Sequence, residues 1–282
     1  MDGLQGWIGR EEIAEDEASL VLLRRLAALL DQDPGDIRRN GWVPQGWHVA
    51  FFGPLTRQSG LGADGHAALG EFLPPVPLPL PRRMFAGRRT WFNAPIRIGA
   101  TLRRVSRIAA ITPKQGRSGA MVFVTIRHGI ESEGVECVVE EQDLVYRAAA
   151  APGSALPEAA PPALPEAAIR QVFTPDPPLL FRYSAVANNG HRIHYDAPYA
   201  TGTEGYPALV VNGGITTTKL TELAKSVLPA PVRKIVTRAG RPLFVNRPVT
   251  LASHLEAPER VRLWALDDAG RLAFDCVAEC AA

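Results

Sequence analysis

The stretch Phe181-Arg-Tyr-Ser-Ala-Val-Ala-Asn-Asn-Gly-His-Arg-Ile-His-Tyr-Asp196 brings two histidines, two asparagines and a carboxylate into one short segment. An apolar, glycine-rich run, Tyr206-Pro-Ala-Leu-Val-Val-Asn-Gly-Gly-Ile215, follows it. Acid/base side chains beside a segment that can bury itself and present backbone N–H groups to a ligand are typical of a catalytic pocket. We therefore expect the active site, and the fold built around it, to centre on these two segments.

The composition is that of a globular protein. Hydrophobic residues make up 46% and charged residues 21% of the 282 residues, enough for a sizeable core in one large domain or two ordinary ones. Lys and Arg exceed Asp and Glu by 31 − 29 = +2, which argues against a nucleic-acid-binding protein. No apolar run reaches the roughly 18–20 residues of a membrane span, and the first residues do not resemble a signal peptide. The three cysteines have no metal-binding spacing, so we expect thiols in a reducing, cytoplasmic setting.

An Ala/Pro-rich segment, residues 148–166, divides the chain. Each proline removes a backbone donor and fixes φ, so this segment is expected to be an extended linker. It separates an N-terminal domain, residues 1–147, from a C-terminal domain, residues 167–282. Both domains show helical spacing, with helices expected over residues 16–31 and 210–228, followed by strand-like runs. A helix followed by antiparallel strands, twice over, predicts an α+β protein built from a duplicated unit.

The strand-like runs alternate apolar and polar side chains or are bounded by turn residues. In the first half we expect strands over residues 102–111, 120–130 and 134–147, with a polar turn at residues 114–119. In the second half we expect strands over residues 179–184, 233–238, 249–256, 261–265 and 273–279.

The polar loop resembles the loop of the MaoC-like hydratase/dehydratase family, which runs Asp-x-Asn-Pro-apolar-His-x-Asp. In this chain Asn189 stands at the position of the first Asp, His191 at the Asn, His194 at the His and Asp196 at the last Asp. The phrase Val210-Val-Asn-Gly213 is similar to the family's apolar-apolar-His-Gly, with asparagine in place of histidine.

Phrases in the first half resemble the branch of type 2 3-hydroxyacyl-thioester dehydratases and of mesaconyl-CoA and itaconyl-CoA hydratases. They are Leu61-Gly-Ala-Asp-Gly-His66, Phe72-Leu-Pro-Pro75, Lys114-Gln-Gly-Arg-Ser-Gly119 and Glu141-Gln-Asp-Leu-Val-Tyr-Arg147. Each phrase is short, but their order and number make the resemblance specific from about residue 42 to residue 280. The resemblance implies a tandem hot-dog fold, in which an antiparallel sheet wraps a central helix in each unit.

The resemblance also implies roles for residues of the loop. Hydration of a C=C bond conjugated to a thioester needs a group that exchanges protons and a donor for the developing oxyanion. We expect His194 to be the principal acid/base, Asn189 to hold the water, and the Gly213 N–H at a helix start to be the oxyanion donor. Because an amide cannot exchange a proton as the family carboxylate does, Asp196 or Asp64 could supply the missing carboxylate, or His194 could act alone.

Two further histidines are less clearly assigned. His191 is open between a catalytic role and a structural role in the loop. Asp64 and His66 could form a second site, but the first half lacks the spacing seen in the second, so we expect them to be structural. No ligand cluster has metal spacing, and coenzyme A is expected only as part of the substrate.

Arginine and lysine side chains are the candidates for binding substrate anions, because guanidinium pairs with phosphate and carboxylate in bidentate fashion. For the phosphates of coenzyme A we expect Arg82, Arg83, Lys114 and Arg117. A free carboxylate on the acyl group would need a positive partner, for which we expect Arg182 or Arg192 beside the loop.

The expected function is reversible hydration of a 2-enoyl-CoA thioester by the C-terminal domain, with the N-terminal domain non-catalytic and forming a substrate tunnel. The branch favours a short, branched dicarboxylic acyl group such as mesaconyl or itaconyl. One alternative is a 3-hydroxyacyl-acyl-carrier-protein dehydratase of fatty-acid synthesis, and another is a thioesterase, since one fold hosts many reactions. A third is a catalytically silent thioester-binding subunit, which the asparagines at 189 and 212 would explain. The duplication permits a monomer, and a homodimer is the alternative.

Overall fold

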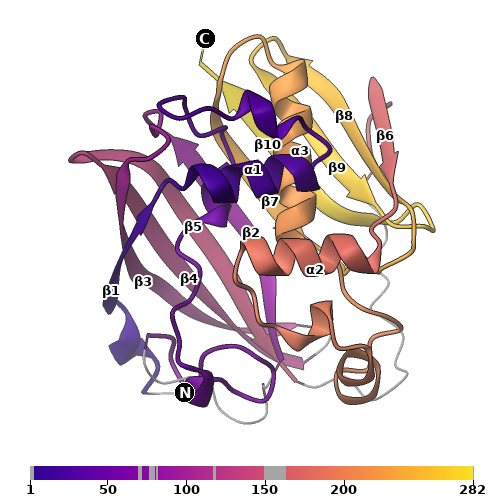
Figure 1. The fold of residues 1–282 in the computed structure, drawn as a ribbon. Coiled ribbons are helices and arrows are strands. Elements are labelled where there is room, and N and C mark those ends of the chain that lie inside the picture. The colour runs from indigo at the N-terminus through magenta and orange to yellow at the C-terminus, as the bar shows by residue number, and fades with distance from the viewer. Residues whose placement is uncertain are drawn as a thin grey trace.

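The computed structural model describes residues 3–68, 72–75, 80, 82–116, 119–148 and 163–281. Ten strands in these residues form one antiparallel sheet (Figure 1). The strands of the first half are β1 Glu11–Glu17, β2 Arg82–Phe92, β3 Thr101–Gly116, β4 Gly119–Ser132 and β5 Val135–Arg147. Those of the second half are β6 Ile169–Phe173, β7 Val232–Ala239, β8 Val249–Ala257, β9 Arg260–Leu266 and β10 Leu272–Cys280. The α-helices are α1 Leu20–Leu29, α2 Pro177–Val186 and α3 Gly213–Val227.

The strand order shows the duplication directly. Across the sheet the strands run β1-β3-β4-β5-β2 and then, in mirrored order, β7-β10-β9-β8-β6. Each strand of the first half therefore has a counterpart five places later in the second half. The halves join where β2 pairs with β7, and there a Cβ on Gly87 would lie 2.7 Å from the Thr237 carbonyl oxygen, so this close approach needs glycine. This is the tandem hot-dog fold that the resemblance implies.

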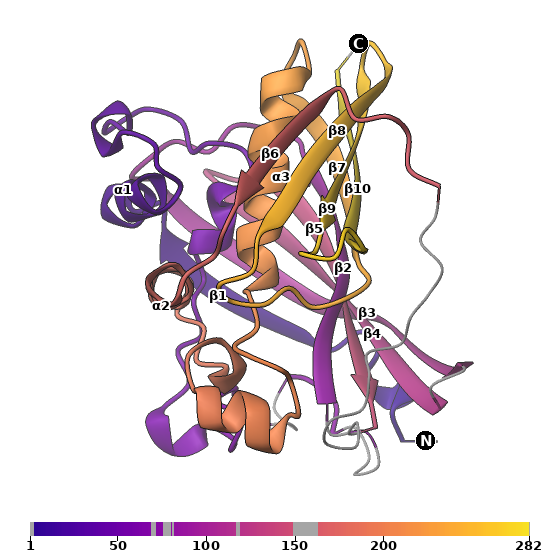
Figure 2. The ribbon, with the colours of Figure 1, turned by 90° about the vertical axis from the view of Figure 1, so that its right-hand side faces the viewer.

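The two halves differ in how their helices meet the sheet. Helix α3 begins at Gly213, buries Ile215, Leu220 and Leu223, and packs against β7 to β10 (Figure 1). Helix α1 instead packs against α2, and both lie to one side of the sheet (Figure 2). The inner face of β2 to β5 is therefore not filled by α1, which leaves space for a cleft.

Residues 179–184, expected as a strand, belong to helix α2. The Asp176 side chain accepts a hydrogen bond from Leu179 N, and prolines occupy the first helical positions. An Asp cap followed by proline is a strong helix start. The buried residues Leu180, Tyr183 and Ser184 follow helical spacing, so the strand prediction was wrong.

The other predictions of secondary structure fared better. The helix over residues 16–31 is confirmed as the shorter α1, and that over residues 210–228 as α3. The other seven expected strands correspond to β3, β4, β5, β7, β8, β9 and β10. The remaining strands β1, β2 and β6 were not predicted; β1 is mostly acidic, and the burial pattern of β2 does not alternate. Most of the expected linker, residues 149–162, lies outside the described residues. None of the described helices is long and apolar enough to cross a membrane.

Candidate active site

A large cleft of about 2340 Å³ lies between the open inner face of the first half and the loops that precede α3. His194, Asn189 and Gly213 line it from the second half. His66 and Arg83 line it from the first half. The cleft thus joins residues that are more than a hundred positions apart in the chain.

His194 is held in one orientation and one protonation form. It ends the short turn η5 Arg192–His194, and its Nδ1 lies 2.7 Å from the Val210 carbonyl oxygen. A carbonyl can only accept, so Nδ1 carries the proton and Nε2 is left as a base. The apolar residues around it form a separate small core: Ile193, Tyr199, Ala200, Tyr206, Val210 and Phe244. The loop is therefore rigidly supported behind the imidazole.

Asn189 belongs to a chain of amide hydrogen bonds. Its Nδ2 donates to Asn212 Oδ1 at 3.0 Å, and Asn212 Nδ2 donates to Ser184 Oγ at 3.1 Å. Its Oδ1 accepts from the backbone N–H of His191 at 3.0 Å. Asn189 and Asn212, two of the departures from the family pattern, are therefore partners, and one Nδ2 hydrogen of Asn189 remains to hold a water molecule.

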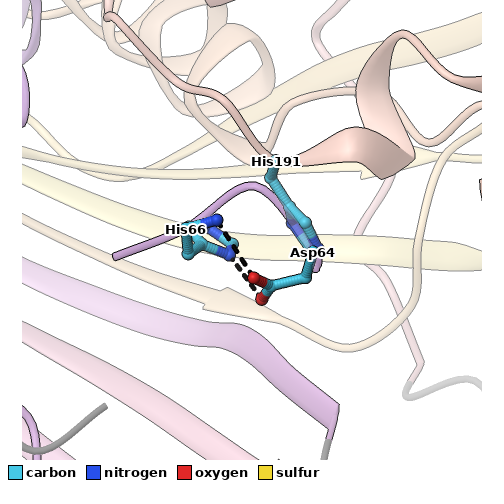
Figure 3. A group of neighbouring side chains, drawn as sticks. All are labelled: Asp64, His66 and His191. Atoms are coloured by element: carbon cyan, nitrogen blue, oxygen red, sulfur yellow. Dashed lines mark hydrogen bonds and ion pairs between the residues drawn. The ribbon is translucent and has the colours of Figure 1, made fainter. Parts of the chain in front are cut away.

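Asp64 and His66, which we expected to be structural, lie directly against His191 (Figure 3). Asp64 Oδ2 is 2.9 Å from His66 Nδ1, and Asp64 Oδ1 accepts from His66 N at 3.0 Å. The His66 and His191 rings lie 4.1 Å apart, and the His191 and His194 rings 5.5 Å apart. A carboxylate–histidine pair from the first half thus extends the histidine pair of the loop.

Close backbone packing holds this pair in place. Gly65, at φ +86°, lies so near Gly190 that a Cβ would come within 2.0 Å of the Gly190 oxygen. The backbone N–H of Arg192 donates to the carbonyl oxygen of Asp64 at 2.9 Å, and Arg192 Nη1 donates to the carbonyl oxygen of Ala63 at 3.0 Å. The sequence signal for this contact was the Asp64-Gly-His66 phrase, but no local pattern indicates what it packs against.

Asp196 lies apart from this chemistry. Its Oδ2 pairs with Arg192 at 2.8 Å and its Oδ1 accepts from Tyr199 N at 3.0 Å. The backbone N–H of Tyr199 and the Arg192 guanidinium lower the pKa of this half-buried carboxyl group. Neither Asp196 nor Asp64 lines the cleft; Asp196 supports the loop, whereas Asp64 lies against His66 and His191.

The Asp64, His66 and His191 side chains also form a group with metal-ligating atoms, each within 4.8 Å of the others. Aspartate and histidine can bind a divalent cation. Here, however, both oxygens of Asp64 are hydrogen-bonded to His66, and the two imidazole rings lie against each other at an angle of 43°. These contacts are those of a carboxylate–histidine pair, so we assign no metal to the group.

Burial keeps the histidines of the site neutral. It lowers the pKa of His194 to about 4, despite the opposing effect of the Val210 carbonyl. Burial and the neighbouring His66 and His194 lower the pKa of His191 to about 2, and burial lowers the pKa of His66. For Asp64 burial acts upward, but the hydrogen bonds from His66 outweigh it and hold the pKa below its usual range. At neutral pH the site therefore contains an ionised carboxylate beside neutral imidazoles.

These shifts predict a loss of stability in acid. A histidine whose pKa is lower in the folded than in the unfolded chain stabilises the fold fully above pH 6.5, and this contribution is lost as the pH falls toward the folded pKa. A shift from 6.5 to about 4 at His194 corresponds to about 3 kcal/mol in the acid limit. We expect the urea midpoint to fall between pH 7 and pH 4.5, and His194→Gln to flatten this dependence. The control variant is His254→Gln, whose side chain makes an exposed hydrogen bond on β8. If this variant flattened the pH dependence of the urea midpoint as much as His194→Gln, the loss of stability in acid could not be assigned to His194.

The start of α3 supplies unpaired donors to the cleft. Among the described residues, the N–H groups of Gly213 and Gly214 have no hydrogen-bond acceptor. A Cβ on Gly214 would lie 1.9 Å from the Tyr183 hydroxyl oxygen, so glycine is required at that position. Backbone donors at a helix N-terminus favour a negative charge, and Gly213 is therefore suitably placed for an oxyanion.

Of the residues expected to bind phosphate, only some line the cleft. Arg83 lines the cleft, whereas Arg82 pairs with Glu204 at 3.1 Å and does not line it. Lys114 is exposed on β3 outside the cleft, and Arg117 lies outside the described residues. Arg147, which the sequence analysis missed, lines the cleft with a buried Nε that has no partner in the described part of the chain.

Comparison with known proteins identifies the family of the chain. Residues 46–245 match the family described as hydroxyacyl-thioester dehydratase type 2. The chain is 42% identical over 275 residues to the mesaconyl-C(4)-CoA hydratase of Chloroflexus aurantiacus, covering 97% of this chain and 96% of that protein.

Solved structures show the same fold at low sequence identity. A MaoC-like dehydratase from Phytophthora capsici has a TM-score of 0.72 at 12% identity, covering 97% of this chain and 95% of that one. A Mycobacterium tuberculosis protein with a double hot-dog fold has a TM-score of 0.57 at 14% identity, covering 96% of both chains. The chain therefore belongs to the hydroxyacyl-thioester dehydratase type 2 family, and it is a hydro-lyase of the hydratase/dehydratase kind.

Proposed function

We propose that this hydro-lyase hydrates a short, branched 2-enoyl-CoA ester whose acyl group carries a second carboxylate, with mesaconyl-C4-CoA as the first candidate. The observation that carries the proposal is that the unprotonated Nε2 of His194 and the free N–H of Gly213 belong to one cleft. The substrate class is supported by the relative from Chloroflexus aurantiacus, which is named for mesaconyl-C(4)-CoA. Itaconyl-CoA, another branched dicarboxylic ester, is the second candidate.

The proposed reaction uses one water molecule and leaves no oxidised or reduced product. His194 Nε2 takes a proton from a water molecule held by Asn189 as the water oxygen bonds to the β-carbon. The electrons of the C=C bond move toward the thioester oxygen, where the Gly213 N–H stabilises the negative charge. The imidazolium then returns its proton to the α-carbon, which completes addition of H and OH across the double bond. Dehydration follows the same steps in reverse.

The Asp64–His66 pair is proposed to support this proton transfer. Its carboxylate is ionised and lies beside the adjacent rings of His66 and His191. A negative charge at that position stabilises the imidazolium that forms during the reaction. In this way the first half would supply the carboxylate that Asn189 lacks.

Coenzyme A is proposed as the carrier. Arg83 and Arg147 line the cleft and could receive its phosphates. The three cysteines are free and buried, which fits the reducing interior of a cell.

The assay is loss of the enoyl-thioester absorbance with purified protein and a panel of crotonyl-, mesaconyl-C4-, itaconyl- and long-chain enoyl-CoA esters. We expect the conjugated band to disappear fastest with a dicarboxylic ester and without release of free thiol. Thiol release would instead indicate a thioesterase. No change with any ester, from folded protein, would support the silent thioester-binding subunit. Faster turnover of a long-chain enoyl group on acyl-carrier protein would support the dehydratase of fatty-acid synthesis.

A further inference from the structure

Five ionisable side chains that the proposed reaction does not use line the cleft on the inner face of the first half. We call them the inner basic cluster: His48, Arg88, Arg104, His128 and Glu140. They come from β2, β3, β4, β5 and the short turn η3 Trp47–Ala50. Charged side chains are rare on the inner face of a sheet unless they form ion pairs or bind a ligand.

The cluster contains two guanidinium groups but one carboxylate. Glu140 is buried, with Oε1 3.1 Å from Arg88 Nε and Oε2 3.2 Å from His48 Nε2. Burial acts to raise the pKa of Glu140, but Arg88 and His48 overcome it and lower the pKa to about 2, so the carboxylate is ionised. Burial lowers the pKa of His128 to about 4, so this ring is neutral at neutral pH. Glu140 therefore pairs with Arg88, whereas Arg104 has only the more distant carboxylates of Glu12, Asp16 and Glu140 around it.

Arg104 has no carboxylate within 4 Å among the described residues. Its Nε is buried without a hydrogen-bond partner, and its guanidinium lies 4.8 Å from the centre of the Phe52 ring. Burial lowers the pKa of Arg104, against the opposing effect of the carboxylates of Glu12, Glu140 and Asp16. Phe52 itself has φ 59°, a backbone conformation that bulky residues rarely adopt. Such strain is retained most often at sites that bind ligands.

Two short routes connect the cluster to the reacting groups. On one side, Phe85 lies 5.5 Å from Arg88 Cζ, and its ring edge lies 3.4 Å from an ideal Cβ on Gly213. On the other, Gly53 follows Phe52 and packs against Asn188, which precedes the proposed water holder in the chain. The cluster is therefore one side chain away from the oxyanion donor and from the catalytic loop.

We propose that Arg104, with Arg88 in the lining of the same cleft, binds the free carboxylate of the acyl group and makes the cleft selective for dicarboxylic thioesters. The inference rests on the proposed function and names the specificity residue for it. It also replaces the two arginines expected from the sequence, because Arg182 is exposed on α2 outside the cleft and Arg192 is paired with Asp196.

The test compares two substrates that differ in one group: mesaconyl-C4-CoA and 3-methylcrotonyl-CoA, in which a methyl group replaces the carboxylate. We expect Arg104→Leu to lower the ratio of their kcat/KM values, dicarboxylic over methyl, by about 10²-fold, as for loss of one partner of a buried charge pair. Arg104→Gln, which keeps the size and polarity of the side chain, is expected to lower the ratio as well. Arg104→Lys should keep most of the preference because it keeps the charge.

The control variant is Arg103→Leu, one residue away on β3, where the side chain is more exposed and pairs with Glu131. This variant should leave the ratio as in the wild type. Equal loss of kcat/KM for both substrates in Arg104→Leu and Arg104→Gln would overturn the inference, as would a wild-type ratio near one that Arg104 does not affect. In both cases hydration itself persists. Equal loss leaves the proposed function standing, whereas a wild-type ratio near one would also contradict the proposed dicarboxylic substrate. Absence of hydration of any enoyl thioester would overturn the proposed activity together with this inference.

Discussion

His194→Asn is expected to lower kcat by about 10²–10⁴ while leaving the fold intact, because it removes the base but keeps its anchor. The Asn Nδ2 occupies nearly the position of the imidazole Nδ1 and can still donate to the Val210 carbonyl, which His194 contacts at 2.7 Å. No atom replaces Nε2, so a proton can no longer be taken from water. Hydration kinetics, read beside thermal unfolding of the same preparation, measure the two effects separately.

The matched control is His254→Asn. His254 also places Nδ1 against a backbone carbonyl, that of Glu166 at 2.9 Å, but on an exposed part of β8. We expect wild-type kcat from this variant. If His194→Asn kept more than about a tenth of wild-type turnover, its role as the principal base would be wrong, and the Asp64–His66 pair would become the stronger candidate.

Gly65→Ala is expected to lower kcat by about 10²-fold, because it separates the Asp64–His66 pair from His191. A Cβ at this position would lie 2.0 Å from the Gly190 carbonyl oxygen, a backbone atom that cannot rotate away. The segments must then move apart, and misplacement of a catalytic group by about 1 Å can cost 10²-fold in rate. Hydration kinetics on folded variant protein measure this loss.

Gly99→Ala separates the effect of the contact from that of backbone strain. Both glycines have left-handed backbones, φ +86° for Gly65 and φ +92° for Gly99, and nothing lies within 4 Å of a Cβ on Gly99. An alanine in this conformation costs roughly 1–2 kcal/mol at either site. We therefore expect Gly65→Ala to lose more stability than Gly99→Ala, by the cost of the contact, and a large loss of kcat in Gly65→Ala alone. Equal activity in the two variants would mean that the Asp64–His66 pair does not contribute to the reaction.

Much of the fold followed from local patterns in the sequence. Helix α3 was predicted because glycines precede a stretch with helical spacing, and most strands because they alternate or end at turn residues. Helix α2 was missed because its apolar run is short, and the Asp176 cap that starts it was not used as a signal. Strand β2 was missed because most of its side chains are only partly buried, so apolar and polar residues do not alternate along it.

In the candidate site, too, some residues could be found from the sequence, whereas their contacts could not. Asn189, His191, His194 and Gly213 were found in the sequence because they lie in two neighbouring segments. The pairing of Asn189 with Asn212 could not be predicted, since each asparagine taken alone suggested lost chemistry. The structure shows that they hydrogen-bond to each other.

The sequence by itself determined most elements of each half, the duplication, and the clustering of acid/base residue types in one loop, because these depend on residue types at short spacing. Only the tertiary structure decided that Asp64 and His66 join that loop and that Arg104 lies in the same cleft, with no partner for its Nε among the described residues. The reason is physical: these contacts depend on the order of strands in the sheet and on backbones that approach closely at Gly65 and Gly190. Neither leaves a periodic signal in the chain, because the partners are far apart in sequence and meet only when the two halves pack together.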